Sequence, residues 1–283
     1  MTLTGLFVPL ITPFDPEGAV AFDALESLAR RLLTEGADGL VALGTTGEPG
    51  SLTEAERQAV IDIAARVCRE RDAKLLVGAN TPQALEDLRG RGEVHAALTV
   101  VPPFVRPGEA GAVAYLTQLA ANSPVPLVIY HVPYRTGQTL SASALTQLGS
   151  LPNVIGVKYA AGGITEDTIA LMADLPPDFA VLGGDDLFIS PSLALGAHGA
   201  ILASAHLATA DFAALITAWR TGDLATARPL GHRLSRLSQT LFAEPNPSVI
   251  KAALHASGRI PTPAVRLPLL PASRDALAAA LTW

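Results

Sequence analysis

Short apolar runs rich in β-branched residues alternate with longer amphipathic segments along most of the chain. The first run, LFVPLIT, precedes the segment FDALESLARRLLTEG, in which Phe22, Leu25, Leu28 and Leu32 recur at the spacing of one helical face. Gly36 follows at a position typical of a helix end. The pattern therefore predicts a buried strand followed by an amphipathic helix.

This strand and helix pattern repeats through the chain. The run GLVALG is followed by a helical segment that Thr53 and Glu56 open with a capping-box pattern. The other runs that precede helical patterns are KLLVGA, AALTVV, PLVIYHV, VIGVKYA, FAVLG and GAILAS. Eight such units within roughly 220 residues predict an α/β fold, the (β/α)8 TIM barrel, because a doubly wound sheet usually stops at five or six strands.

The remaining residues carry only helical patterns. They include LATARPLGHRLSRLSQTLF, PSVIKAALHASG and SRDALAAALTW, and no Gly/Ser-rich linker separates them from the rest. We expect a barrel over residues 1–222 and a C-terminal helical extension over residues 223–283 that packs on it.

Composition narrows the classes of partner. A net charge of -6 gives no electrostatic gain on nucleic acid or on an anionic membrane. The segment 187–210 lacks charged residues, but Pro191 and Gly196 interrupt it, so a short helix and a buried strand suit it better than a membrane span. The single cysteine, Cys68, in a helical pattern, and an N-terminus unlike a signal peptide favour a cytoplasmic protein.

One lysine stands inside an apolar strand pattern. Lys158 lies in VIGVKYAA, and only Lys74 and Lys251 accompany it among 20 lysines and arginines. A buried amine loses hydration, which favours its neutral and nucleophilic form. A lysine that ends a strand can instead extend to water or pair with a carboxylate, and placement alone leaves both alternatives open.

Other reactive side chains follow strands that would end at the same rim. GTTGE, residues 44–48, offers hydroxyls and backbone N–H groups to an anion, although such a turn is often only a strand exit. YHVPYRTG supplies Tyr130 and Arg135, which could also be a core aromatic and a surface charge. Because active sites of TIM barrels lie at the carboxyl ends of strands, this convergence favours catalysis.

Metal and nucleotide chemistry find no support in the sequence. His131 and His206 lack the spacing of metal ligands, and no GxGxxG or Walker loop is present. The sequence GGDD, residues 183–186, allows close backbone approach, while its aspartates could simply cap the next helix. We expect no metal and no cofactor.

These motifs together resemble the dihydrodipicolinate synthase and N-acetylneuraminate lyase family of class I aldolases. The similarity runs nearly end to end and is carried by TGLFVPLITPF, GTTGE, YHVPYRTG, GVKYA, GGDD and EPNPSVIKAALHASG. The resemblance implies a lyase or synthase in which Lys158 forms an imine with pyruvate. It further implies condensation with aspartate semialdehyde, as in lysine biosynthesis, and a homo-oligomer, either a tetramer or a dimer.

The resemblance also assigns roles to single residues. The turn at Thr45 and Thr46 would bind the pyruvate carboxylate, and the Thr45 hydroxyl would pass protons. Tyr130 would be the general acid and base. Arg135 would hold the carboxylate of the second substrate. The backbone at two further positions, Gly184 and Ile201, would line the pyruvate pocket.

One stretch departs from the family pattern. In VVPPFVRP, Pro103 and Phe104 stand where synthases have two tyrosines, of which the second completes a proton relay in a neighbouring subunit. Phe104 has no proton to pass. The alternatives are a synthase in which water substitutes, an aldolase that releases pyruvate from a 2-keto-3-deoxy sugar acid, and a non-catalytic keto-acid sensor.

Overall fold

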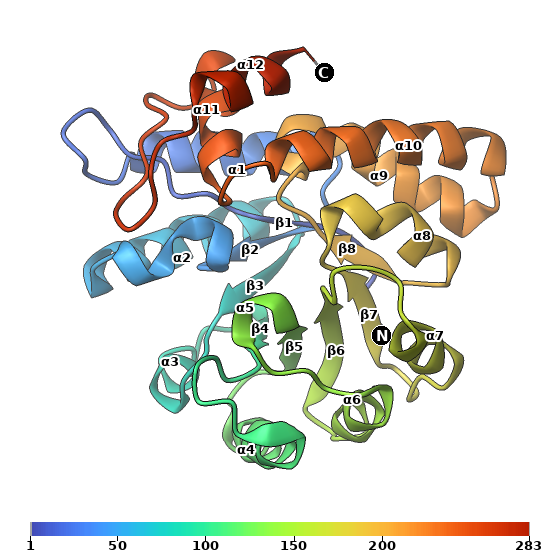
Figure 1. Cartoon of the computed structure of the whole chain (residues 1–283). Helices are drawn as coiled ribbons and strands as arrows, with labels where there is room; N and C mark the ends of the chain where they lie inside the picture. The colour runs from blue at the N-terminus through green and yellow to red at the C-terminus, as the bar shows by residue number, and fades with distance from the viewer. Residues whose placement is uncertain (1, 283) are drawn as a thin grey trace.

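Eight parallel strands close into a barrel in the computed structural model, which describes residues 2–282. Each strand pairs with the next, and β8 pairs with β1 (Figure 1). The strands are β1 (Gly5–Pro9), β2 (Gly39–Ala42), β3 (Lys74–Gly78), β4 (Val94–Val100), β5 (Leu127–His131), β6 (Val154–Tyr159), β7 (Ala180–Gly183) and β8 (Gly199–Ile201). The predicted (β/α)8 barrel is confirmed.

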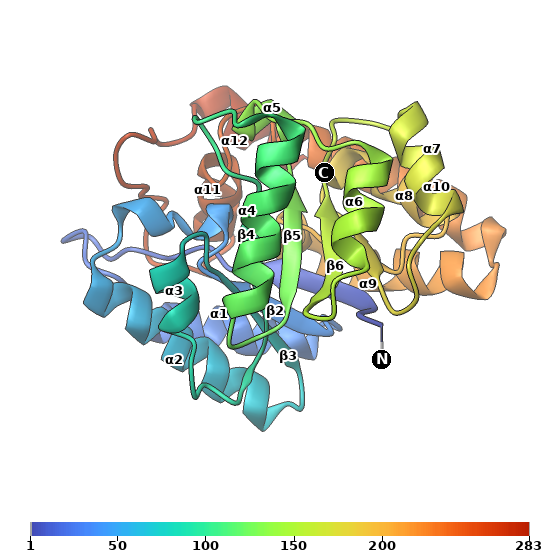
Figure 2. The same cartoon turned by 90° about the horizontal axis from the view of Figure 1, so that it is seen from below.

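Helices surround the strands, and most of them follow the predicted order. They are α1 (Phe22–Thr34), α2 (Glu54–Glu70), α3 (Pro82–Glu86), α4 (Gly108–Asn122), α5 (Pro133–Thr136), α6 (Ala142–Gly149), α7 (Glu166–Ala173), α8 (Ile189–Ala194), α9 (Ala205–Thr221), α10 (Leu224–Leu241), α11 (Ser248–Ala256) and α12 (Arg274–Leu281). In Figure 2, α4 and α6 lie across the outside of β4 to β6. The one-turn helix α5 was not predicted; Pro133 begins it and Gly137, with φ 68°, ends it.

Local sequence signals account for the helix limits. Thr53 and Glu56 form the predicted capping box, in which each side chain accepts a hydrogen bond from the other residue's backbone N–H. Helix α1 ends at Thr34, two residues before Gly36, which adopts φ 108°. A positive φ of this kind is easy only for glycine, so Gly36 turns the chain toward β2.

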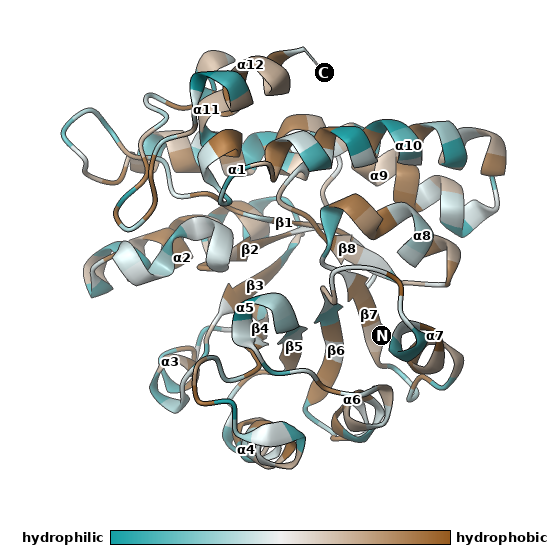
Figure 3. Cartoon of the chain, in the orientation of Figure 1, coloured by the Kyte–Doolittle hydropathy of each residue, from teal (hydrophilic) through white to brown (hydrophobic). Residues whose placement is uncertain are grey.

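Two apolar cores hold the barrel together. One fills the barrel interior and includes Phe7, Val41, Leu182 and Ile201. The other lies between the strands and the surrounding helices. Because side chains alternate along a strand, each strand contributes to both cores. Figure 3 shows mostly hydrophobic strands whose colour turns hydrophilic at the tips of β5 and β6.

The C-terminal helices pack against the side of the barrel formed by the last units. Helix α10 lies on α8 and α9, α11 lies on α9, and α12 contacts α10 and α11. The division at residues 222 and 223 stays a prediction about domain organisation. Within residues 2–282, we find no helix with the length and apolar character that a membrane crossing requires.

Candidate active site

Lys158 lies on β6 with its side chain directed into the barrel. Its strand register pairs it with Tyr130 on β5 and with Leu182 on β7. Side chains two residues apart share one face of a strand, and Ala160 belongs to the interior core. Lys158 is only 6% exposed. The alternative of a lysine extended into bulk water is therefore wrong.

The amine of Lys158 has no ionic partner within hydrogen-bonding distance. Among residues 2–282, no carboxylate or carbonyl accepts a hydrogen bond from its Nζ; the close contact is the Tyr130 ring, whose centroid lies 4.3 Å away. Burial lowers the pKa of Lys158 to about 8. At pH 7 about one amine in ten is then neutral, against about one in three thousand at an unperturbed pKa. This amine is suited to nucleophilic attack.

Tyr130 presents a protonated phenol beside that amine. Burial raises the pKa of Tyr130 to about 12, while the Arg135 charge and the Thr45 side chain act in the opposite direction. A phenol that keeps its proton at pH 7 can donate it to a reacting oxygen. The structure thus brings Lys158, Tyr130 and Thr45 to one place.

The GTTGE turn is one turn of 3₁₀ helix, Thr45–Gly47, directly after β2. Thr45 is exposed and its side chain lies within reach of Tyr130, whereas Thr46 is buried and its hydroxyl accepts a hydrogen bond of 2.9 Å from Asn246 Nδ2. Asn246 is a contact that sequence reasoning missed, although it lies within the EPNP stretch that supported the family resemblance. The C-terminal extension therefore reaches the turn directly.

Gly184 and Ile201 line the interior around Lys158 in different ways. A Cβ atom at Gly184 would lie 2.8 Å from Lys158 Cγ and 2.9 Å from Cε, so the lysine stem occupies the space that any other residue would need. Ile201 on β8 is fully buried in the interior core. Both predicted positions therefore border the barrel interior, and Gly184 directly contacts the lysine.

Two carboxylates from GGDD sit on the same rim. Asp186 accepts a hydrogen bond of 2.6 Å from the Ser204 N–H, and Asp185 accepts one of 2.6 Å from the Gly162 N–H. Neither side chain caps the helical turn that follows, so the capping alternative is wrong. Burial raises the pKa of Asp186 to about 6, and its charge raises that of Lys158. Sequence reasoning missed this electrostatic role.

Arg135 lies in α5 above the β5 end and is exposed. Its guanidinium carbon lies 5.8 Å from the Tyr134 ring centroid. Its charge lowers the pKa of both Lys158 and Tyr130, which places it within electrostatic reach of the two groups. An exposed cation at the mouth of the barrel can bind a carboxylate without closing the site.

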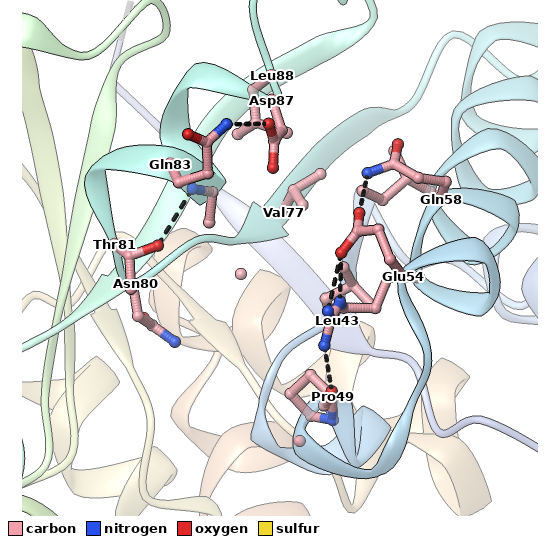
Figure 4. Close-up of a pocket in the computed structure, with 15 residues that line it drawn as sticks. Leu43, Pro49, Glu54, Gln58, Val77, Asn80, Thr81, Gln83, Asp87 and Leu88 are labelled. Atoms are coloured by element: carbon pink, nitrogen blue, oxygen red, sulfur yellow. Dashed lines mark hydrogen bonds and ion pairs between the residues drawn. The ribbon is translucent and has the colours of Figure 1, made fainter.

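Two cavities border this end of the barrel. One of about 260 Å³ is lined by Tyr134, Gly184, Asp185 and Asp186, of which Gly184 packs against the Lys158 stem. A larger one of about 410 Å³ lies between α2, β3 and α3, and its wall includes Glu54, Gln58 and Asp87 (Figure 4). None of the predicted site residues lines the larger cavity, so its size does not mark the reactive centre.

The two histidines noted near the rim, His131 and His206, are buried and neutral. Burial lowers the pKa of His131 and of His206 to about 4. Within residues 2–282, no group of three or more His, Cys, Asp or Glu side chains is arranged to hold a metal ion. The absence of a cofactor stays a prediction.

Comparisons with known proteins agree with this arrangement. The family model described as "Dihydrodipicolinate synthetase family" matches residues 2–281. The 4-hydroxy-tetrahydrodipicolinate synthase of Synechococcus elongatus is 39% identical over 96% of this chain and 93% of its own length. A second synthase, from Clostridium acetobutylicum, is 32% identical over 97% of both chains.

Solved structures give the same result. The dihydrodipicolinate synthase of Thermotoga maritima has a TM-score of 0.94 at 26% identity, with 100% of this chain and 97% of that chain covered. The synthase of Acinetobacter baumannii, solved with pyruvate, has a TM-score of 0.93 at 31% identity, covering 99% and 98%. The chain belongs to the dihydrodipicolinate synthetase family, which confirms the resemblance and the predicted class of lysine-dependent lyase or synthase.

Proposed function

We propose that this protein condenses pyruvate with aspartate semialdehyde through an imine on Lys158. The single observation that supports this most is a buried amine of lowered pKa that lacks an ionic partner and faces a protonated tyrosine. The names of the relatives support the choice of reaction.

The first half of the reaction needs three groups. The neutral Lys158 amine attacks the pyruvate C2 carbon, and the carbinolamine then loses water as Tyr130 donates a proton to the departing oxygen. The carboxylate of pyruvate would bind at the Thr45–Gly47 turn, through backbone N–H groups and hydroxyls. Its methyl group would face the apolar interior near Ile201.

The second half uses the iminium as an electron sink. The Tyr130 phenolate left by the first half takes a proton from the pyruvate methyl group, which gives an enamine; the enamine carbon attacks the aldehyde, and Tyr130 returns that proton to the new alkoxide. Arg135 would hold the carboxylate of the aldehyde substrate, because a guanidinium forms paired hydrogen bonds with that group.

Phe104 favours a second candidate. It is 92% exposed and cannot take the place of a hydroxyl in a proton relay. An aldolase acting on a 2-keto-3-deoxy sugar acid would use the same Lys158 imine without that relay. The two candidates therefore share the Lys158 chemistry and differ in the aldehyde they use.

We also propose a cytoplasmic homo-oligomer, either a tetramer or a dimer. Phe104 and Val105, 92% and 77% exposed, form an apolar surface that a second copy could cover. Sedimentation velocity at micromolar concentration tests this, and a single species of 29.3 kDa would contradict it.

Borohydride trapping tests the central chemistry. Reduction in the presence of pyruvate should add a reduced pyruvyl group to the peptide that contains Lys158 and to no other peptide. A coupled assay of pyruvate consumption over a panel of aldehydes then separates the candidates. Preference for aspartate semialdehyde supports the synthase, preference for a sugar-derived aldehyde supports the aldolase, and trapping without any turnover supports a keto-acid sensor.

A further inference from the structure

A second buried lysine lies behind the GTTGE turn. Lys251, in the middle of α11, is 0% exposed. Its Nζ donates a hydrogen bond of 2.8 Å to Glu48 Oε1 and another of 2.8 Å to the carbonyl oxygen of Thr12. The Phe14 ring centroid lies 4.0 Å from the same nitrogen. The ammonium therefore forms two hydrogen bonds and one contact with an aromatic ring.

The partner of Lys251 belongs to the turn itself. Glu48 follows the 3₁₀ turn Thr45–Gly47 and adopts φ 53°, ψ 42°. This left-handed conformation is unfavourable for a residue with a Cβ atom and persists where surrounding contacts impose it. Glu48 Oε1 accepts from Lys251, and Oε2 accepts a hydrogen bond of 2.8 Å from the Arg266 N–H. Both carboxylate oxygens therefore fix the end of the turn.

Neighbouring bonds fix the rest of the turn from the same side. The Thr12 hydroxyl donates to the Gly47 carbonyl at 2.8 Å, and Asn246 donates to the Thr46 hydroxyl. Thr12 thus bonds to Gly47 with its side chain and to Lys251 with its carbonyl. The turn is held between the loop after β1 and the C-terminal extension, and Lys251 bonds to both of these supports.

Removal of the ammonium would leave Glu48 buried with an unpaired charge. A buried carboxylate without its counter-charge is strongly unfavourable, so Glu48 would move toward water and release the left-handed residue that ends the turn. Thr45 and Thr46 precede it by three and two residues. A shift of this segment would therefore displace the hydroxyls and backbone N–H groups that would bind the pyruvate carboxylate.

We propose that Lys251, through Glu48, is a positioning residue for the pyruvate site, holding the Thr45–Gly47 turn where it binds the substrate carboxylate. Lys251 touches no substrate in this scheme, and the imine still forms on Lys158. The inference rests on the proposed function, because it assumes that pyruvate binds at this turn.

The test compares lysine variants of the full chain. We measure the pyruvate concentration that gives half-maximal borohydride trapping on Lys158, together with the KM for aspartate semialdehyde. Lys251→Met should raise the half-saturating pyruvate concentration at least tenfold. Trapping at saturating pyruvate should still reach the yield of the unmodified protein, and the KM for the aldehyde should change less than twofold. Lys74→Met makes the same chemical change at the opposite end of the barrel, on β3, and should leave both values unchanged.

A stability control separates positioning from general weakening. Leu116→Ala opens a cavity in the apolar core between α4 and the strands, and should lower the melting temperature without changing pyruvate half-saturation. Where Lys251→Met does not fold, Glu48→Gln serves instead, with an expected rise of about threefold. Unchanged half-saturation in a folded variant of either residue overturns the inference. Absence of trapping in the unmodified protein overturns the proposed function itself.

Discussion

The two buried lysines of this barrel have similarly lowered pKa values but differ in their partners. Burial lowers the pKa of both Lys158 and Lys251 to about 8. Lys251 is bound by a carboxylate and a carbonyl, whereas the Nζ of Lys158 faces the Tyr130 ring and hydrogen-bonds to no carboxylate or carbonyl among residues 2–282. Burial and a lowered pKa therefore do not identify a nucleophile. The absence of a bound acceptor distinguishes Lys158, because its lone pair becomes available once the proton leaves.

The largest expected effect is the loss of the nucleophile. Lys158→Met should reduce turnover at least about a thousandfold, because the other buried amine, Lys251, is engaged by Glu48 and the Thr12 carbonyl. Lys251→Met should keep a trappable amine at position 158. Peptide mass analysis after borohydride reduction, with kcat measured on the same samples, checks both. A pyruvate adduct on Lys251 in the Lys158→Met protein would show that bound acceptors do not prevent a buried lysine from reacting.

Stability should respond in the opposite order. Lys251→Met leaves Glu48 unpaired, so we expect the free energy of unfolding to fall by about 3 kcal/mol. Lys158→Met replaces an amine without an ionic partner by an apolar side chain of similar length, and should leave that free energy equal or higher. Urea unfolding of both variants measures the difference. An equal fall in the free energy of unfolding of the two variants would contradict the difference in ionic partners between the two lysines.

A variant of Tyr130 tests whether this residue donates a proton in the reaction or only packs against Lys158. Tyr130→Phe keeps the ring beside Nζ but removes the donor, so kcat should fall about a hundredfold. Single-turnover trapping should show slow imine formation with an unchanged final yield. A variant with normal kcat would assign the proton transfers to Thr45 or to water instead.

A variant of Arg135 should affect the binding of one substrate and not of the other. Arg135→Ala should raise the KM for aspartate semialdehyde about tenfold through loss of a charge-assisted contact. The yield of the pyruvate adduct on Lys158 should be preserved, because Arg135 is exposed at the rim and, among residues 2–282, forms no hydrogen bond with the turn that would bind pyruvate. Steady-state kinetics with each substrate varied in turn measures this. Equal weakening toward both substrates would contradict the assigned role.

The sequence predicts Lys158 but not the environment of Lys251, and the reason is the range of the interactions. Alternating strand and helix patterns are local, and they place Tyr130 and Lys158 on one rim because parallel strands end at the same edge. The Lys251–Glu48 pair joins residues 203 positions apart, and no periodicity marks it. The rarity of lysine in this chain and the presence of Glu48 in GTTGE were the available signals. The packing of Gly184 against the lysine stem likewise requires coordinates.

The smallest expected effect concerns the carboxylate that acts on Lys158 from a distance. The Asp186 charge raises the pKa of Lys158 against the larger effect of burial. Asp186→Asn should therefore lower that pKa, increase the neutral fraction at pH 7, and shift the acid limb of imine formation toward lower pH. The gain at pH 7 is bounded at about tenfold, since about one amine in ten is already neutral.

Glu48→Gln provides the contrast for this last effect. It removes a carboxylate from Lys251 rather than from Lys158, so the acid limb of imine formation should keep its midpoint even where pyruvate binding weakens. The measurement is the initial rate of trapping against pH at saturating pyruvate for both variants. A shift of that limb in Glu48→Gln alone would mean that the charge of the Lys251–Glu48 pair, and not that of Asp186, sets the pKa of the nucleophile.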